Sequence, residues 1–90
     1  MDMTDAAFIL LARAAGDPSR LRMLLQLGEG PRSVGQLGAS AGVTSAAATY
    51  HTKLMSRAGL VRVERAGRRT LVRRVERRWA AIVIAFGRMD

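Results

Sequence analysis

Arginine is the side chain through which this sequence could do most of its chemistry, and that chemistry is anion binding. The chain has 15 basic and 7 acidic residues, a net charge of +8, and all but one of the basic residues are arginine. Residues 57–90 hold ten arginines against three acids, a net of +7, whereas residues 1–56 carry +1. This asymmetry is typical of a polyanion binder, and guanidinium groups suit phosphate and guanine. A GC-rich coding sequence would explain the Arg-to-Lys ratio but not the asymmetry.

Catalytic and metal-binding chemistry have little support in the sequence. There is one histidine, His51, and no cysteine, which excludes a disulfide framework, a thiolate metal site and a thiol redox switch. A catalytic set of nucleophile, general base and orienting group cannot be built from one imidazole and seven scattered acids. We therefore expect no enzyme activity, no cofactor and no metal, and a structural or phosphate-contacting role for His51.

A polar stripe lies within residues 44–57, which are expected to form a helix. Ser45, Thr49 and Lys53 repeat at i, i+4, so that two hydroxyl groups and an ammonium group could meet base edges and phosphates. An ordinary helix with a solvated polar face is the alternative. The residues expected to contact DNA from this helix are Ser45, Ala46, Thr49, Tyr50 and Lys53. The opposite face, expected to pack into the core, holds Ala48, Thr52 and Met55.

Two helices are expected in the first third of the chain. Residues 5–15 are apolar nearly all round, with Thr4 as the N-cap and Gly16 as the stop. A helix of this kind must be covered on more than one side, which in so short a chain suggests a partner subunit. The second helix starts after Asp17, with Pro18 at its first position. Its buried face is predicted to consist of Leu21, Leu24, Leu25 and Leu27.

A helix-turn-helix is predicted over residues 33–57. After a turn at 28–32, Ser33 and Gln36 have the capping-box spacing and open a short helix that runs through Ala41. Two short helices joined by a tight turn that contains glycine are typical of this motif, although structural helix pairs share the pattern. Val34 and Leu37 are expected to face the core, and Gly42 is expected to end the helix.

The segments 61–65 and 70–75 alternate with period two and predict a β-hairpin with a four-residue tip at 66–69. A helix-turn-helix followed directly by a hairpin is a winged helix, so 61–75 is the expected wing. The tip could reach the DNA backbone or the minor groove, or it could merely aid solubility. The arginines expected to make the DNA contacts are Arg65, Arg68 and Arg69.

A last helix is expected over 76–88, where apolar residues recur at i, i+3, i+4 and i+7, although 82–84 alone could form a strand. With the first helix it would form a dimer interface, so that 1–15 and 76–88 are the expected dimerisation helices; a purely intrachain core is the alternative. The predicted interface residues are Phe8, Ile9, Leu11, Trp79, Ile82, Val83 and Phe86.

The elements together predict one domain, 1–90, with a fold that is mainly α with a small β-hairpin: a dimeric winged helix-turn-helix. The longest uncharged apolar run, 79–86, is far shorter than the ~20 residues that span a bilayer. The acidic N-terminal residues lack the basic region of a signal peptide. A cytoplasmic protein without membrane contact is therefore expected.

Three segments, in this order and spacing, carry a family resemblance. Residues 16–24 (GDPSRLRML) open the second helix, 34–44 form the first part of the helix-turn-helix, and 50–61 (YHTKLMSRAGLV) end the second part. All three resemble the ArsR/SmtB-type winged-helix repressors, a family of small dimeric transcription factors. The resemblance covers about 16–75 and implies a DNA-binding regulator. The family usually has Leu where Thr52 stands here.

The departures from the family concern its sensors. Many members sense metals or sulfur species through paired Cys or through clusters of Asp, Glu and His on the last helix. This chain has no Cys, and its last helix has no His and only Glu76 and Asp90 as acids. We therefore expect a homodimeric repressor or autoregulator that lacks these sensors and responds to its own level, a protein partner or a small-molecule effector. The alternative is a winged-helix module for protein–protein contacts. Four arginines could pair with Glu64 or Glu76 or flank the dimer interface: Arg73, Arg74, Arg77 and Arg78.

Overall fold

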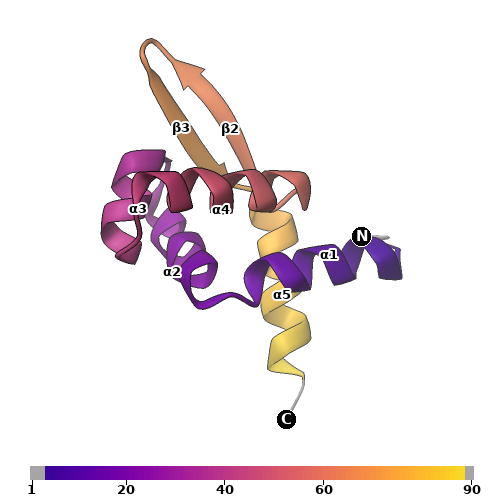
Figure 1. Ribbon diagram of the computed structural model, residues 1–90. Helices are drawn as coiled ribbons and strands as arrows, with labels where there is room; N and C mark the ends of the chain where they lie inside the picture. The colour runs from indigo at the N-terminus through magenta and orange to yellow at the C-terminus, as the bar shows by residue number, and fades with distance from the viewer. Residues whose placement is uncertain (1–3, 89–90) are drawn as a thin grey trace.

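The computed structural model describes residues 4–88, and Figure 1 shows their course. Residues 1–3 and 89–90, which complete the predicted domain 1–90 and the predicted region 1–15, lie outside the described residues. In chain order the elements are α1 Asp5–Ala15, α2 Pro18–Gln26, the 3-10 turn η1 Leu27–Glu29, β1 Arg32–Ser33, α3 Val34–Ala41, α4 Ser45–Arg57, β2 Val61–Ala66, β3 Arg69–Arg74 and α5 Glu76–Gly87.

Side-chain caps define where the first two helices begin. Thr4 Oγ1 accepts a hydrogen bond from the backbone N–H of Ala7 at 3.1 Å. Asp17 Oδ2 accepts one from the backbone N–H of Arg20 at 3.0 Å, and Pro18 occupies the first position of α2. Each bond joins the side chain of the capping residue to the backbone N–H three residues later, which is the geometry of an N-cap. The predicted starts of both helices are therefore confirmed.

The buried face of α2 differs from the prediction. Leu21 and Leu25 are exposed, whereas Met23 is buried beside Leu24 and Leu27. At about 100° per residue, Met23, Leu24 and Leu27 lie on one side of the helix, the side that packs against α1 and α3. The prediction is confirmed for Leu24 and Leu27 and wrong for Leu21 and Leu25, because it left out Met23 and so rotated the buried face.

A short strand joins the wing. The segment 28–32, predicted as a turn, contains η1 and then enters β1, which pairs antiparallel with β3. Arg32 is opposite Val72 and Ser33 is opposite Leu71, so the sheet over residues 4–88 has the order β1-β3-β2. Two residues are too few to show a period-two pattern, which explains why the sequence did not reveal this strand.

The hairpin is tighter than predicted. Strands β2 and β3 remain paired as far as Ala66 and Arg69. The turn therefore has two residues, Gly67 and Arg68, instead of the four that were predicted. Gly67 has φ +64°, the left-handed conformation that the first central residue of a tight hairpin turn requires. The predicted wing is confirmed with a shorter loop.

The core corrects two of the predicted interface residues. Leu11 is 2% exposed and Ile82 is 1% exposed within the single chain, so neither has surface left for direct contact with a partner. Both pack in a cluster that draws on every helix of residues 4–88 and on the base of the wing. Phe8 and Trp79 are half-buried against the same cluster, whereas Ile9, Val83 and Phe86 are exposed. The segment 82–84 is helical, not a strand.

The elements are arranged along one long axis, with extents of 39 × 24 × 22 Å. The β2–β3 hairpin projects from one end of the helical body, and the C-terminal part of α5 extends from the opposite side (Figure 1). Helix α4 lies between the hairpin and α1. Among residues 4–88, no helix has the length and apolar character needed to cross a bilayer.

Candidate nucleic-acid interface

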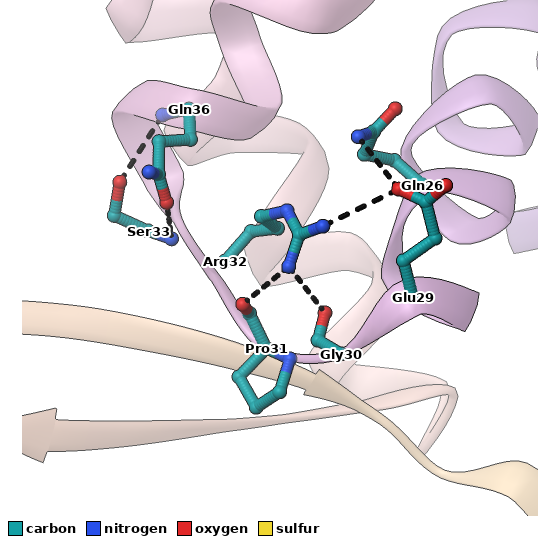
Figure 2. Close-up of polar contacts among 7 residues, drawn as sticks. All are labelled: Gln26, Glu29, Gly30, Pro31, Arg32, Ser33 and Gln36. Carbon is teal, nitrogen blue, oxygen red and sulfur yellow. Dashed lines mark hydrogen bonds and ion pairs between the residues drawn. The ribbon is translucent and has the colours of Figure 1, made fainter.

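Helix α3, the first helix of the helix-turn-helix, is held at its start by two sets of polar contacts (Figure 2). In the capping box, Ser33 Oγ accepts from the N–H of Gln36 at 3.2 Å, and Gln36 Oε1 accepts from the N–H of Ser33 at 2.9 Å. The Arg32 guanidinium donates to the carbonyl of Pro31 at 3.0 Å and to Glu29 at 3.3 Å. These bonds fix the path of the chain from η1 into α3.

Helices α3 and α4 approach each other closely at Gly38 and Ala48. A Cβ atom at Gly38 would lie only 2.9 Å from the Ala48 Cβ, so a larger residue there would push the helices apart. Gly42 ends α3 with φ +71°, and Thr44 Oγ1 then caps α4 by accepting from the N–H of Ala47 at 3.1 Å. The predicted helix-turn-helix is confirmed, and its geometry sets the direction of α4.

The two faces of α4 have the burial that the periodicity predicts. Ala48 and Met55 are fully buried and Thr52 is 4% exposed. The Thr52 Oγ1 atom is buried and has no hydrogen-bond partner among the described residues. The five residues of the predicted DNA-contacting face are all exposed: Ser45, Ala46, Thr49, Tyr50 and Lys53.

The wing arginines are exposed but divided between two faces of the hairpin. Arg65 is opposite Thr70 and Arg69 is opposite Ala66. Because side chains alternate along a strand and opposed residues share a face, Arg65 and Arg69 point to opposite sides. Arg68 lies in the turn itself. The exposed Arg62, which is not among the predicted DNA contacts, shares the face of Arg69.

A groove joins the α4 stripe to the base of the wing. Its volume is about 390 Å³, and Thr49 and Lys53 line it on the helix side, with Val63 and Thr70 on the wing side. Arg65 shares the hairpin face of Val63 and Thr70. The structure therefore brings the stripe and the near face of the wing to one surface, whereas Arg69 lies on the far face.

Arg74 fastens the wing to the helical body. Its Nη1 donates to the Leu24 carbonyl at 2.7 Å, and its Nη2 lies 2.8 Å from Glu76 Oε1. The guanidinium carbon is 4.8 Å from the centre of the Trp79 ring, a cation–π distance. The expected pairing with Glu76 is confirmed, and this arginine has a structural role.

The other three unassigned arginines have different positions. Arg73 Nε lies 3.5 Å from Glu64 Oε1 in an exposed ion pair, as anticipated. Arg78 Nη1 donates to the Gly59 carbonyl at 3.1 Å, and Arg77 is exposed. Only part of the C-terminal arginine excess is therefore available to a polyanion.

His51 connects α4 to the junction of α1 and α2. Arg20 Nη1 donates to His51 Nδ1 at 3.0 Å, and Arg20 Nε donates to the Ala14 carbonyl at 2.7 Å. The backbone N–H of Arg20 holds the pKa of Asp17 below its ordinary value, and the charge of the Arg20 guanidinium adds to this effect. His51 and Arg20 are 31 residues apart, so no local sequence signal pointed to the pair.

The fold and this surface define a winged helix-turn-helix domain. Residues 15–64 match the family model described as "Helix-turn-helix domain", and the chain belongs to this family. The resemblance seen in the sequence is thereby confirmed. Within residues 4–88, no three His, Cys, Asp or Glu side chains lie close enough together to hold a metal ion.

Individual relatives agree with this assignment. The chain is 37% identical over 83 residues to the HTH-type transcriptional repressor SmtB of Mycobacterium tuberculosis. The match covers 92% of this chain and 61% of that repressor, so the chain spans about three-fifths of the relative's length.

Solved structures share the fold. A crystal structure of a possible transcriptional regulator for arsenical resistance superposes with a TM-score of 0.77 at 26% identity, over 86% of this chain and 80% of that one. A homodimeric winged helix-turn-helix DNA-binding domain from Mycobacterium bovis, a possible ArsR-family regulator, superposes at 0.76 and 20% identity, over 100% of this chain and 94% of that one.

Proposed function

We propose that this chain is a homodimeric, sequence-specific regulator of transcription that binds double-stranded DNA as a repressor. The observation that carries the proposal is the common surface formed by the α4 stripe and the near face of the wing. Thr49 and Lys53 line one groove with Val63 and Thr70, and the wing extends this surface with exposed arginines. The SmtB relative is named a transcriptional repressor, which supports repression rather than activation.

In this proposal α4 enters the major groove and reads base edges. Ser45 and Thr49 lie in its first two turns, the part of a recognition helix that reaches base edges, and Lys53 follows one turn later. Ser and Thr hydroxyls donate or accept, and an ammonium group binds phosphate or guanine. The flanking Ala46 and Tyr50 complete the contact surface.

The wing supplies backbone contacts that carry little base information. The Arg65, Arg68 and Arg69 side chains make no hydrogen bond or ion pair with another residue of 4–88, so they keep their donors for an external anion. Since Arg65 is on the near face and Arg68 in the turn, these two would meet the strand beside α4. Arg69 and Arg62 on the far face would strengthen the long-range attraction.

Dimerisation is proposed through the apolar surface that α1 and α5 leave uncovered. Ile9, Val83, Ile84 and Phe86 are each 46–55% exposed on these two contacting helices, and apolar side chains exposed together are typical of a protein–protein interface. Leu11 and Ile82 would support this surface from the core beneath it. The M. bovis relative with the same fold is described as a homodimer.

Selection of bound sequences from random duplex DNA, followed by titration of the selected and a scrambled duplex at several salt concentrations, tests the proposal. We expect an inverted repeat with half-site centres about one helical turn, ~34 Å, apart. Affinity should fall steeply with salt for both duplexes. Equal affinity for the two duplexes would refute sequence-specific binding, and no affinity for either would favour the protein–protein module.

A further inference from the structure

A second groove lies between α4 and α1, and Arg57 lines both this groove and the one beside the wing. Its volume is about 340 Å³. Its apolar floor and its cationic rim come from α1, the start of α2 and the end of α4, and no acidic residue lines it. The lining residues are Leu10, Arg13, Ala14, Arg20, Leu54, Arg57 and Ala58.

One of the three arginines is held in place before any ligand arrives. Arg20 is half-buried, and its Nε and Nη1 are fixed by the Ala14 carbonyl at 2.7 Å and by His51 Nδ1 at 3.0 Å. Its Nη2 donates no hydrogen bond to another residue of 4–88. A guanidinium with two of its nitrogens fixed and the third available loses little further conformational freedom when it binds an anion.

The floor of the groove is apolar and uncovered within the chain. Leu10 is 55% exposed, and Leu54 and Ala58 are half-buried. A volume of about 340 Å³ is within the range of small-molecule sites, which combine an apolar lining with a few fixed polar groups. Three guanidinium groups and no acidic side chain line the groove, which disfavours a cationic ligand and complements a negative one. Asp17, whose carboxylate accepts from the backbone N–H of Arg20, lies outside the lining and offsets only part of this charge.

We propose that this groove binds a small organic carboxylate with an apolar body. The carboxylate accepts from Arg20 Nη2, the exposed Arg13 and Arg57 add attraction from the rim, and the apolar body covers Leu10 and Leu54. A carboxylate fits better than a phosphate ester here, because a single charge costs less to desolvate over an apolar floor.

Such a ligand would contact α1 and the C-terminal end of α4 together. If α1 belongs to the dimer interface and α4 reads DNA, the ligand would be an effector of DNA binding. This consequence alone rests on the proposed function. Binding to the free protein does not require DNA, so failure of the ligand site and failure of the DNA proposal are distinguishable.

The probe is 4-phenylbutyrate, with its neutral amide as the matched compound, titrated into the whole chain and followed by methyl and amide NMR shifts. We expect saturable shifts at Leu10, Leu54 and Ala58, and at least about tenfold weaker binding of the amide, because it lacks the charge that Arg20 pairs with. Shifts centred on Val83 and Phe86, or equal binding of acid and amide, would overturn the proposal.

Variants localise the site. Arg20→Gln should weaken phenylbutyrate binding about tenfold, and Arg57→Gln, on the exposed rim, about twofold. Arg22→Gln, an exposed neighbour on the same helix outside the groove, should keep wild-type affinity. Because Arg20 also binds His51, the NMR spectrum of Arg20→Gln is first checked for a folded protein. If Arg20→Gln is unfolded, the Arg13→Gln/Arg57→Gln double variant tests the site in its place. Unchanged affinity in the Arg13/Arg57 double variant would contradict the proposal.

Discussion

Arg20 donates from Nη1 to His51 Nδ1 across 3.0 Å, and this bond ties the start of α2 to the middle of α4. Arginine stays protonated and supplies the donor, so Nδ1 must act as the acceptor and carries no proton in this geometry. The same guanidinium also binds the Ala14 carbonyl at 2.7 Å. The orientation of the proposed recognition helix therefore depends on a contact with the junction between α1 and α2.

His51→Ala is expected to lower the free energy of unfolding by about 1 kcal/mol, because it leaves a half-buried Arg20 donor without its partner. Urea unfolding followed by circular dichroism measures the effect. Thr49→Ala, an exposed position one half-turn away, is the control and should change the stability by less than about 0.5 kcal/mol. Equal effects of the two substitutions would show that the Arg20–His51 bond contributes nothing to stability.

Asp17 should make stability depend on pH in the acidic range. Its pKa is lowered in the folded chain, chiefly by the backbone N–H of Arg20, so the unfolded chain takes up the proton first as the pH falls. Its contribution is present above the ordinary Asp pKa of about 3.9 and is lost as the pH falls through the lower folded pKa. Asp17→Asn keeps a capping side chain but loses this charge. In urea titrations from pH 6 to pH 3, the variant should be less stable at pH 6 and approach wild type at pH 3; a constant difference would contradict the charge effect.

Thr52→Val is expected to raise the free energy of unfolding by about 1 kcal/mol, since it replaces a buried hydroxyl without a partner by a methyl group of the same shape. Thr49→Val, on the exposed face of the same helix, should have little effect. Thermal and urea unfolding of both variants measure the difference. A destabilised Thr52→Val protein would mean that the hydroxyl is satisfied in solution.

The wing and α4 should contribute differently to DNA binding. Replacing Arg65 and Arg68 by Ala should weaken binding to all sequences and reduce the slope of log K against log salt by about 0.9 for each phosphate group that the variant no longer neutralises. Thr49→Ala should instead change the preferred sequence, at a cost of about 1–3 kcal/mol if Thr49 makes a good base contact. Arg88→Ala, at the far end of α5, is the charge control. A wild-type salt slope in the Arg65/Arg68 variant would show that the wing does not contact the DNA backbone.

Ile9→Glu and Val83→Glu should each shift the chain from dimer to monomer, because a charge in the proposed α1–α5 interface would be buried without a partner. Leu25→Glu places the same charge on the exposed apolar face of α2 and should leave the dimer intact. Sedimentation velocity at micromolar concentrations separates the 9.8 kDa monomer from the dimer. A wild-type monomer, or dissociation by Leu25→Glu alone, would place the interface elsewhere.

Several elements could be predicted from the sequence because their signals lie within three or four residues. Thr4, Asp17 and Thr44 cap the helices that follow them, the Ser33–Gln36 pair opens α3, and the spacing along α4 separates its buried and exposed faces. Caps and helix periodicity depend on neighbouring residues, so the helix-turn-helix and the wing could be predicted without the tertiary fold.

Features that join distant segments depend instead on the packing of the whole chain. The pairing of β1 with β3, the choice of Met23 over Leu21 and Leu25, and the burial of Leu11 and Ile82 within one chain each depend on which element packs where. The division of Arg65 and Arg69 between two faces follows from the hairpin register, which a slip of one residue would reverse. The β1–β3 pair and the core contacts bring together residues tens of positions apart, so the packing of the whole chain decides among arrangements that local propensity leaves equal.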